Sequence, residues 1–280
     1  MRIKNYVCSF HRRVMDRDNQ NAMIRLVRGF LWPFSILYGR LAGLRNWAYN
    51  YGLKSAVQVD VPVISVGNIT VGGTGKTPFV VWLCEQLRRA GREPAILSRG
   101  YGKDASSGVD DENEMLGALV QDVPVVVNPD RVEGAKTAVQ REGADVLVMD
   151  DGFQHRRLAR DCDIVLVDAL NPFGGGRAIP LGTLREPLSG LSRAHVLVIT
   201  RSDQVKRNRL ERLIETLQGY TGTVPVAIAR HAPSGMYEMG RAADDAVVAD
   251  LDALREKRWG AFCGIGNPAA FRRTLEGMGV

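Results

Sequence analysis

The segment from Thr70 to Thr77 carries residues suited to binding a phosphate group. It reads TVGGTGKT and lies between an apolar run at 61–67 and an apolar segment that begins near Pro78. A glycine-rich turn between a strand and a helix surrounds phosphate oxygens with backbone N–H groups and the positive end of the helix dipole. We expect Lys76 to reach the β- and γ-phosphates of a nucleotide and Thr77 to hold Mg²⁺. The predicted nucleotide-binding positions are Thr70, Val71, Gly72, Gly73, Thr74, Gly75, Lys76 and Thr77.

The loop departs from the P-loop pattern G-x-x-x-x-G-K-[ST] at one position, where Thr70 stands in place of the first glycine. The opening bend must therefore accommodate a β-branched side chain. The alternative interpretation is a glycine-rich turn that binds no ligand. The order of the residues and their position between a strand and a helix favour the nucleotide site.

Two adjacent carboxylates, Asp150 and Asp151, follow an apolar run at 146–149. The end of a buried strand is where an aspartate can reach Mg²⁺ directly or through water, so both are metal candidates. Adjacent residues of a strand face opposite ways, and we expect only one of the two to touch the ion. The alternative is a polar strand end that caps a turn.

Further charged residues could serve a transfer reaction. An acidic cluster at 110–112 follows the segment SRGYG at 98–102. In an α/β sheet such loops gather around the ligand, and one carboxylate could act as general base toward a hydroxyl acceptor. A solvated loop is the alternative. Arg185 offers a cation for a transferring phosphoryl group, unless it forms an ion pair with Glu186 at a helix start.

The elements that must position these residues follow from the apolar pattern. From Val61 onward, short β-branched runs alternate with segments of helical periodicity, which predicts an α/β fold with a mainly parallel sheet flanked by helices. The predicted strands are 61–67, 93–98, 123–127, 144–150, 163–169, 195–200, 224–229 and 259–266, and the predicted helices are 78–90, 131–142, 206–218 and 268–278. Residues 55–230 should form the core domain. Residues 231–280 should form an irregular excursion and then a last strand and helix of the core.

Residues 1–54 form a basic segment with ten Lys/Arg and two Asp/Glu, whereas the rest of the chain has 27 basic and 29 acidic residues. Between Met23 and Tyr51, apolar residues recur every three or four positions, which predicts an amphipathic helix that breaks or kinks near Pro33. Such a helix can lie on an anionic membrane surface or pack against the main domain, and both could hold for different faces. The apolar stretch 29–39 is far shorter than the ~20 residues that cross a bilayer.

Composition narrows the compartment and the partners. With 280 residues and 45% hydrophobic side chains, the chain can form one large core or two modest domains. The four cysteines lack CxxC pairing and close histidine spacing, which indicates neither a disulfide framework nor a zinc site. No secretory signal is evident, so we expect a cytoplasmic protein. Basic residues interleaved with apolar ones argue against nucleic acid as the partner, and no obligate protein partner is inferred.

In sequence order, the motifs resemble those of the tetraacyldisaccharide 4′-kinase family over nearly the whole chain. The matching segments are WPFSILYGRLAGLRN, VPVISVGNITVGGTGKTP, AILSRGYG, VDDEN, DDGFQHRRL, DIVLVDA, PLGTLREPL and GIGNP. Their succession carries the resemblance, because a generic P-loop protein would not combine SRGYG, DDGFQHR and LREP after a basic apolar helix.

The resemblance implies a P-loop NTPase-like fold and transfer of the γ-phosphate of ATP, with Mg²⁺. The acceptor would be the 4′-hydroxyl of a tetraacylated glucosamine disaccharide 1-phosphate, a lipid A precursor, at the inner face of the cytoplasmic membrane. The resemblance implies that Lys76 and Thr77 bind phosphate and metal, that Asp111 is the catalytic aspartate, and that Arg185 contacts phosphate. Asp150 and Asp151 match the two carboxylates of the family's DDGFQH motif. Arg99 and Tyr101 would contact the substrate headgroup.

The chain departs from the family pattern in two places. Asp110 replaces the usual glycine of the G-D-E segment and Asn113 its frequent proline. Members also usually continue past the position of Val280 to an F-x-D-H-like segment whose histidine partners the catalytic aspartate, and no stretch of these 280 residues matches it. We therefore expect normal ATP binding but slow transfer from this length of chain.

Two other functions compete with this interpretation. Residues 200–203, TRSD, resemble a guanine-reading T-K-x-D sequence, which would suit a P-loop GTPase or a metallochaperone-like switch. Arg201 replaces the lysine of that pattern, and the Asp150-Asp-Gly sequence is one residue short of D-x-x-G. A kinase for another membrane or sugar acceptor is the other alternative. Turnover of GTP without an acceptor would favour the switch, and acceptor-dependent use of ATP a kinase.

Overall fold

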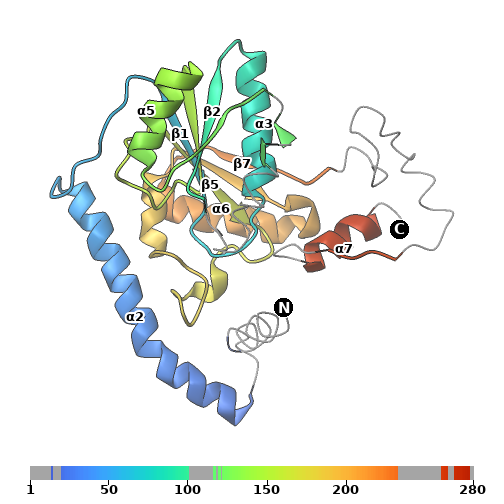
Figure 1. The fold of residues 1–280 in the computed structure, drawn as a ribbon. Helices are drawn as coiled ribbons and strands as arrows, with labels where there is room; N and C mark the ends of the chain where they lie inside the picture. The colour runs from blue at the N-terminus through green and yellow to red at the C-terminus, as the bar shows by residue number, and fades with distance from the viewer. Residues whose placement is uncertain are drawn as a thin grey trace, which may run out of the picture.

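The computed structural model describes residues 14, 20–100, 116–117, 119–120, 122–232, 260–263 and 268–277. Its centre is a seven-stranded sheet with the order β3-β2-β4-β1-β5-β6-β7, in which every pair is parallel (Figure 1). The strands are β1 (Val63–Gly67), β2 (Pro94–Ser98), β3 (Val125–Val127), β4 (Val146–Asp150), β5 (Cys162–Asp168), β6 (Val196–Thr200) and β7 (Val226–Ile228). The predicted α/β class with a parallel sheet is confirmed.

Helices cover both faces of the sheet. The helix α3 (Lys76–Arg89) packs Val80 and Cys84 against one face, in a cluster with alternate residues of β1, β2, β4, β5 and β6. The other face is covered by α5 (Arg131–Glu142) over β1, β2 and β4, and by α6 (Arg207–Thr221) over β5 and β6. Strands covered on both sides need apolar residues at consecutive positions, which explains the unbroken apolar runs of β4, β5 and β6.

The arrangement places the ends of β1 and β4 side by side. β1 lies between β4 and β5, and Val66 near its end is paired with Asp150 at the end of β4. The loop after β1 and the turn after β4 therefore open at the same edge of the sheet. In parallel sheets, ligands bind at this carboxyl edge, where the chain connections diverge to the two sides.

The predicted strand at 259–266 is wrong where the structure describes it. Residues 260–263 pair with no strand, and the Phe262 side chain is 94% exposed. The sheet ends at β7, whose Ile228 is itself 60% exposed. An apolar run by itself does not reveal whether a sheet edge pairs with it. The helix α7 (Pro268–Gly277) follows as predicted, whereas most of the predicted excursion lies outside the described residues.

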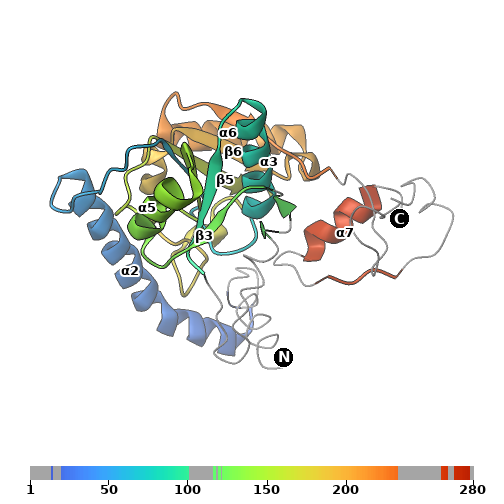
Figure 2. The same cartoon turned by 45° about the horizontal axis from the view of Figure 1, so that its top comes forward.

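The helix α2 (Ala22–Asn50) forms an arm on the outside of the molecule. It begins where the Asn21 side chain accepts a hydrogen bond from the backbone N–H of Met23 at 2.9 Å, and it continues through Pro33 without interruption. The predicted helix is present and does not break at Pro33, whereas the predicted alternative of a kink there stays a prediction. In two views α2 runs along the outer side, away from α3 and α6 (Figures 1 and 2). Among the described residues, no helix meets the length and apolarity needed to cross a membrane.

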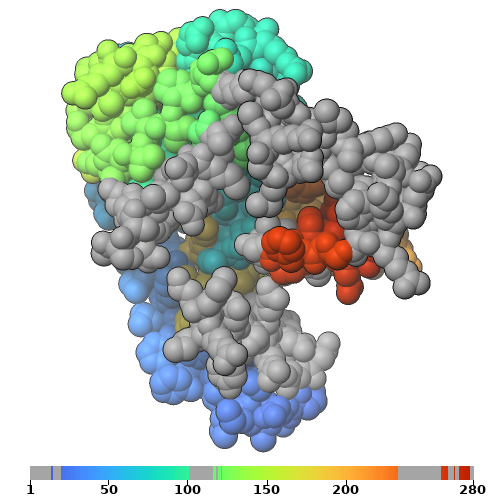
Figure 3. Space-filling view, turned by 45° about the vertical axis from the view of Figure 1, so that its right-hand side comes forward, coloured from blue at the N-terminus to red at the C-terminus, as the bar shows by residue number. Residues whose placement is uncertain are grey.

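One face of α2 packs on the domain and the other does not. Ser35 Oγ donates a hydrogen bond to the carbonyl of Ala178 at 2.7 Å, and Gly39 and Gly43 lie beside Ala178 and Pro187. The opposite face carries large apolar side chains, each at least half exposed: Met23, Leu26, Phe30, Phe34, Leu37, Leu41 and Leu44. In Figure 3 the visible part of α2, in blue, lies along the lower edge of the molecule.

Candidate functional site

The loop between β1 and α3 has the conformation that its glycines permit. Gly75 lies immediately before α3 with φ 86°, in the left-handed region, and Gly72 has φ 129°. A Cβ atom on Gly75 would also come within 3.0 Å of His231 Nε2. Only glycine combines this backbone with this contact, so the last turn of the loop depends on Gly75.

Asn68, which lies between β1 and the loop, organises the loop from beneath. Its fully buried side chain donates to Thr74 Oγ1 at 3.0 Å and accepts from Lys76 Nζ at 3.3 Å. From the end of β6, which lies beyond β5 in the sheet, Thr200 Oγ1 donates to the carbonyl of Thr74 at 2.9 Å. These bonds fix the path of the backbone before a ligand arrives, which lowers the entropy cost of binding.

Arg201 braces the same loop from the other side. Its buried guanidinium forms an ion pair with Asp168 at the end of β5 and donates to the carbonyl of Gly73 at 2.8 Å. Arg201 has φ 55°, a left-handed conformation that costs energy for a residue with a side chain. The TRSD sequence thus contributes two residues that support the phosphate loop, a role that the sequence did not predict.

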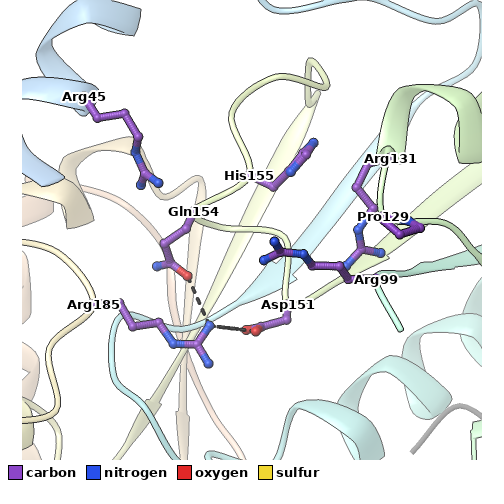
Figure 4. Close-up of a pocket in the computed structure, with 8 residues that line it drawn as sticks. All are labelled: Arg45, Arg99, Pro129, Arg131, Asp151, Gln154, His155 and Arg185. Atoms are coloured by element: carbon purple, nitrogen blue, oxygen red, sulfur yellow. Dashed lines mark hydrogen bonds and ion pairs between the residues drawn. The ribbon is translucent and has the colours of Figure 1, made fainter. Parts of the chain in front are cut away.

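Asp151 contacts two other predicted site residues, Lys76 and Arg185. It follows β4 in a left-handed conformation, with φ 50°. Its carboxylate accepts from Arg185 Nη1 at 2.7 Å through each oxygen and lies 3.5 Å from Lys76 Nζ (Figure 4 shows the pair with Arg185). Burial opposes ionisation of Asp151, but Lys76 and Arg185 outweigh it and hold the pKa of this carboxyl below its usual value. The aspartate is therefore ionised at neutral pH.

Asp150 lies in a different environment, as adjacent residues at a strand end should. It is the last residue of β4 and is buried, and its carbonyl accepts from Arg131 Nη2 at 2.9 Å. Arg131 also donates to the carbonyl of Leu97 in β2. Thr77, in the first turn of α3, is half-buried. The described residues include no cluster of three or more His, Cys, Asp or Glu with the geometry of a metal site.

A cavity of about 320 Å³ opens beside Asp151. Eight residues line it: Arg45, Arg99, Pro129, Arg131, Asp151, Gln154, His155 and Arg185 (Figure 4). They come from α2, the segment after β2, the start of α5 and the residues just before it, the turn after β4, and the segment before η2 (Leu188–Arg193). Burial and the neighbouring Arg131, Arg160 and Arg99 lower the pKa of His155 to about 4, so this imidazole is uncharged at neutral pH. Four arginines give the cavity its positive charge.

Arg185 and Glu186 do not form the ion pair that was one sequence interpretation. Arg185 binds Asp151, whereas Glu186 is fully buried and binds Arg193 at 2.9 Å. Glu186 also accepts from Gln154 Nε2 at 2.8 Å. Most of the predicted catalytic, metal and substrate residues lie around Asp151: Lys76 and Arg185 contact it, Asp150 precedes it in the chain, and Arg99 lines the same cavity. Asp111 and Tyr101 lie outside the described residues.

Comparison with known proteins identifies the lineage. The sequence model of the family LpxK, tetraacyldisaccharide-1-P 4′-kinase, matches residues 27–280. The chain belongs to the tetraacyldisaccharide-1-P 4′-kinase family. The resemblance predicted from the succession of motifs is thus confirmed.

Named relatives of the kinase family support this membership. A tetraacyldisaccharide 4′-kinase of Anaeromyxobacter sp. (strain K) is 43% identical over 254 residues, which cover 85% of this chain and 66% of that protein. A second tetraacyldisaccharide 4′-kinase, from Halothermothrix orenii, is 39% identical over 266 residues, covering 87% of this chain and 69% of the relative. The chain spans about two thirds of the length of the curated relatives that it matches.

A solved structure of the kinase family shares the fold. The crystal structure of LpxK from Aquifex aeolicus, described as an "apo" form in complex with ATP, superposes with a TM-score of 0.70 at 32% sequence identity. The match covers 91% of this chain and 79% of the Aquifex chain. The predicted P-loop NTPase-like fold is therefore confirmed.

Proposed function

We propose that this protein transfers the γ-phosphate of ATP to the 4′-hydroxyl of a tetraacyldisaccharide 1-phosphate. The observation that carries the proposal is the convergence of Lys76, Asp151 and Arg185 between the phosphate loop and an arginine-lined cavity, in a member of this kinase family. Phosphoryl transfer needs a donor site and an acceptor site that meet at one point, with positive groups around the moving phosphate.

The loop from Thr70 to Thr77 binds the phosphates of ATP. Its backbone N–H groups and the start of α3 face the anion, and Lys76 contacts the terminal phosphates. In the structure, Lys76 contacts Asn68 and Asp151, so the lysine is already oriented and would exchange partners on binding phosphate. Arg185, already beside Asp151, stabilises the charge that spreads over the transferring group.

Mg²⁺ would be held by the Thr77 hydroxyl together with the carboxylate of Asp150 or Asp151. These hard oxygen donors, completed by phosphate oxygens and water, suit an ion that rarely relies on an all-protein cage. When bound, the ion neutralises phosphate charge; positioning Lys76 and Arg185 is the task of the protein.

The arginine-lined cavity holds the acceptor headgroup. Arg45, Arg99 and Arg131 line it together with Arg185, and guanidinium groups bind phosphate and sugar oxygens through several directed hydrogen bonds. The acceptor proposed here carries a phosphate of its own. By family resemblance, Tyr101 contacts the same headgroup and Asp111 removes the proton from the hydroxyl that attacks.

The exposed apolar face of α2 lies on an anionic membrane surface at the cytoplasmic side. Its side chains recur at three- and four-residue spacing and so form one stripe, and the exposed Arg25 and Arg40 lie on the same helix. An apolar stripe accompanied by cations is the composition that binds an interface without crossing it. A substrate with several acyl chains would be reached from that position.

Vesicle binding tests the membrane contact. Changing Leu37 and Leu41 together to glutamate should release the protein from phosphatidylglycerol-rich vesicles, because both side chains are 56% exposed on the stripe. The control is Ile228→Glu, which adds one negative charge to a similarly exposed apolar residue on the strand β7. If the Leu37/Leu41 variant bound vesicles as well as the Ile228→Glu control and the wild type do, α2 would not make the contact.

Acceptor dependence tests the reaction. We expect ATP consumption to require tetraacyldisaccharide 1-phosphate, and thin-layer chromatography to show label from the γ-phosphate in the lipid. Hydrolysis of GTP that needs no acceptor would instead assign the protein to the switch class. ATP use that depends only on other sugars or lipids would keep the kinase chemistry and replace the acceptor.

A further inference from the structure

Glu186 is a buried carboxylate that holds several elements together. Its side chain is fully inaccessible to solvent, and its two oxygens accept from Arg193 Nη2 at 3.1 and 2.9 Å. Arg193 in turn lies over the ring of Phe153 at 4.4 Å. Gly190 leaves no spare room, because a Cβ there would come within 2.4 Å of Glu186 Oε2. A carboxylate held so closely can move little without moving its partners.

One partner of Glu186 comes from the arm α2. Asn46, which is 7% exposed, donates from Nδ2 to Glu186 Oε2. The backbone at the same position is held as well, since Arg156 Nη1 donates to the Asn46 carbonyl at 2.8 Å. Asn46 Oδ1 is buried and has no hydrogen-bond partner among the described residues, an arrangement that costs free energy. The bond to Glu186 is thus the one side-chain hydrogen bond that the structure gives Asn46 among the described residues.

The other oxygen of Glu186 leads to the phosphate loop. Gln154 Nε2 donates to Glu186 Oε1 at 2.8 Å and to the carbonyl of Asn68 at 2.9 Å. Its Oε1 accepts from Arg185 Nη1 at 3.3 Å. One amide thus touches both Asn68, which orients Lys76, and Arg185, which binds Asp151.

We propose that Asn46 is a positioning residue that couples α2 to the phosphate-binding loop through Glu186 and Gln154. The path consists of three consecutive hydrogen bonds between buried or half-buried groups, so each group limits the orientation of the next. Asn46 touches neither ATP nor acceptor in this scheme. It acts by keeping Gln154 where Asn68 and Arg185 need it. The proposal deepens the kinase function proposed above and rests on it for the catalytic readout.

The test compares the buried Asn46 with the exposed Asn50, one helical turn further along α2. Asn46→Ala removes the donor to Glu186, whereas Asn50→Ala removes an acceptor of Arg156 and leaves Glu186 untouched. We expect Asn46→Ala to lower kcat about 10- to 100-fold in the full chain, because small misplacements at a transfer site are costly. Asn50→Ala should stay within about twofold of the wild type. Equal losses in both variants would indicate helix docking only and would overturn the proposal.

A double-mutant cycle tests the path itself. If Asn46 acts through Gln154, then Asn46→Ala should change kcat by no more than about twofold in a Gln154→Ala background. Losses that multiply would mean that the two residues act independently and would refute the coupling. The isosteric Asn46→Asp leaves no cavity and places a carboxylate beside Glu186, so it should also slow transfer. A fast Asn46→Asp enzyme would overturn the proposal even if the alanine variant did not fold.

Two measurements without acceptor separate this proposal from the proposed reaction. Asn46→Ala should speed amide hydrogen exchange across residues 68–77 and weaken ATP affinity, while Asn50→Ala should alter neither. If the wild type phosphorylates no disaccharide lipid, the proposed function fails, but these two readouts still decide the coupling. Unchanged exchange and unchanged ATP affinity in Asn46→Ala would contradict it.

Discussion

Asp151→Asn should separate ATP binding from phosphate transfer. In the structure Lys76 is shared between Asn68 and Asp151, and phosphate must compete with this carboxylate for the lysine. Neutralising Asp151 removes the competitor and also removes a negative charge close to the phosphates. We therefore expect the variant to bind Mg²⁺-free ATP more tightly than the wild type while it transfers phosphate more slowly.

The geometry sets the size of the effect. Lys76 Nζ and Asp151 Oδ1 are 3.5 Å apart, and their side chains are 13% and 22% exposed. At an effective dielectric constant of about 20, unit charges at this distance attract by roughly 5 kcal/mol. Desolvation and the competing bond from Arg185 offset most of that, which leaves a net of about 1–2 kcal/mol. The expected gain in affinity is therefore about 5- to 30-fold.

Isothermal titration of ATP in the presence of a chelator measures this gain. The matched control is Asp145→Asn, which removes the same charge just before β4, at the opposite end of the strand, where the carboxylate is paired with Arg92. The control should bind as the wild type does. If Asp151→Asn binds Mg²⁺-free ATP no more tightly than the control, Asp151 does not compete for Lys76 and the reasoning is wrong.

Three further outcomes follow from the structure. Lys76→Ala should abolish detectable transfer but leave the fold intact, as checked by circular dichroism and thermal unfolding, because Asp151 keeps its bonds to Arg185. Gly67→Ala should destabilise the protein by roughly 3 kcal/mol in urea unfolding, since its Cβ would lie 2.6 Å from Phe153 Cβ. The folded pKa of His155, about 4, lies below the unfolded value of 6.5, so the unfolded state binds the extra proton and stability falls as pH drops from about 6.5 to 4. His155→Gln should lose less stability across that window, and equal losses in both proteins would refute the assignment.

Much of the fold could be predicted because a strand that is buried on both faces needs consecutive apolar residues, and such runs are visible in the sequence. The apolar runs of β4, β5 and β6 are each four residues long, those of β1 and β2 are shorter, and all five are strands. The error at 260–263 came from the same apolar signal used without knowledge of which strand forms the sheet edge. The predicted break at Pro33 is wrong because a proline removes one backbone hydrogen bond but need not end a helix, and α2 continues through it.

Site residues that belong to a local sequence motif could be predicted, whereas residues that meet only through tertiary packing could not. Lys76 and Asp151 belong to recognisable motifs, and the parallel sheet accounts for their proximity. Glu186 was noted only as a possible partner of Arg185, because nothing in the local sequence reveals that its bonds go to α2 and Gln154. Such contacts join segments more than thirty residues apart and depend on tertiary packing. The boundaries proposed at 54/55 and 230/231 remain predictions.

The most direct test of the proposed function is analysis of the lipid product. The protein is incubated with ATP labelled in the γ-phosphate, Mg²⁺ and tetraacyldisaccharide 1-phosphate, and the lipid is analysed by mass spectrometry and NMR. The proposed function predicts one added phosphate at the 4′ position, one ADP formed for each phosphate transferred, and no product with Lys76→Ala. Formation of ADP without a phosphorylated lipid, or a phosphate at another position of the disaccharide, would contradict it.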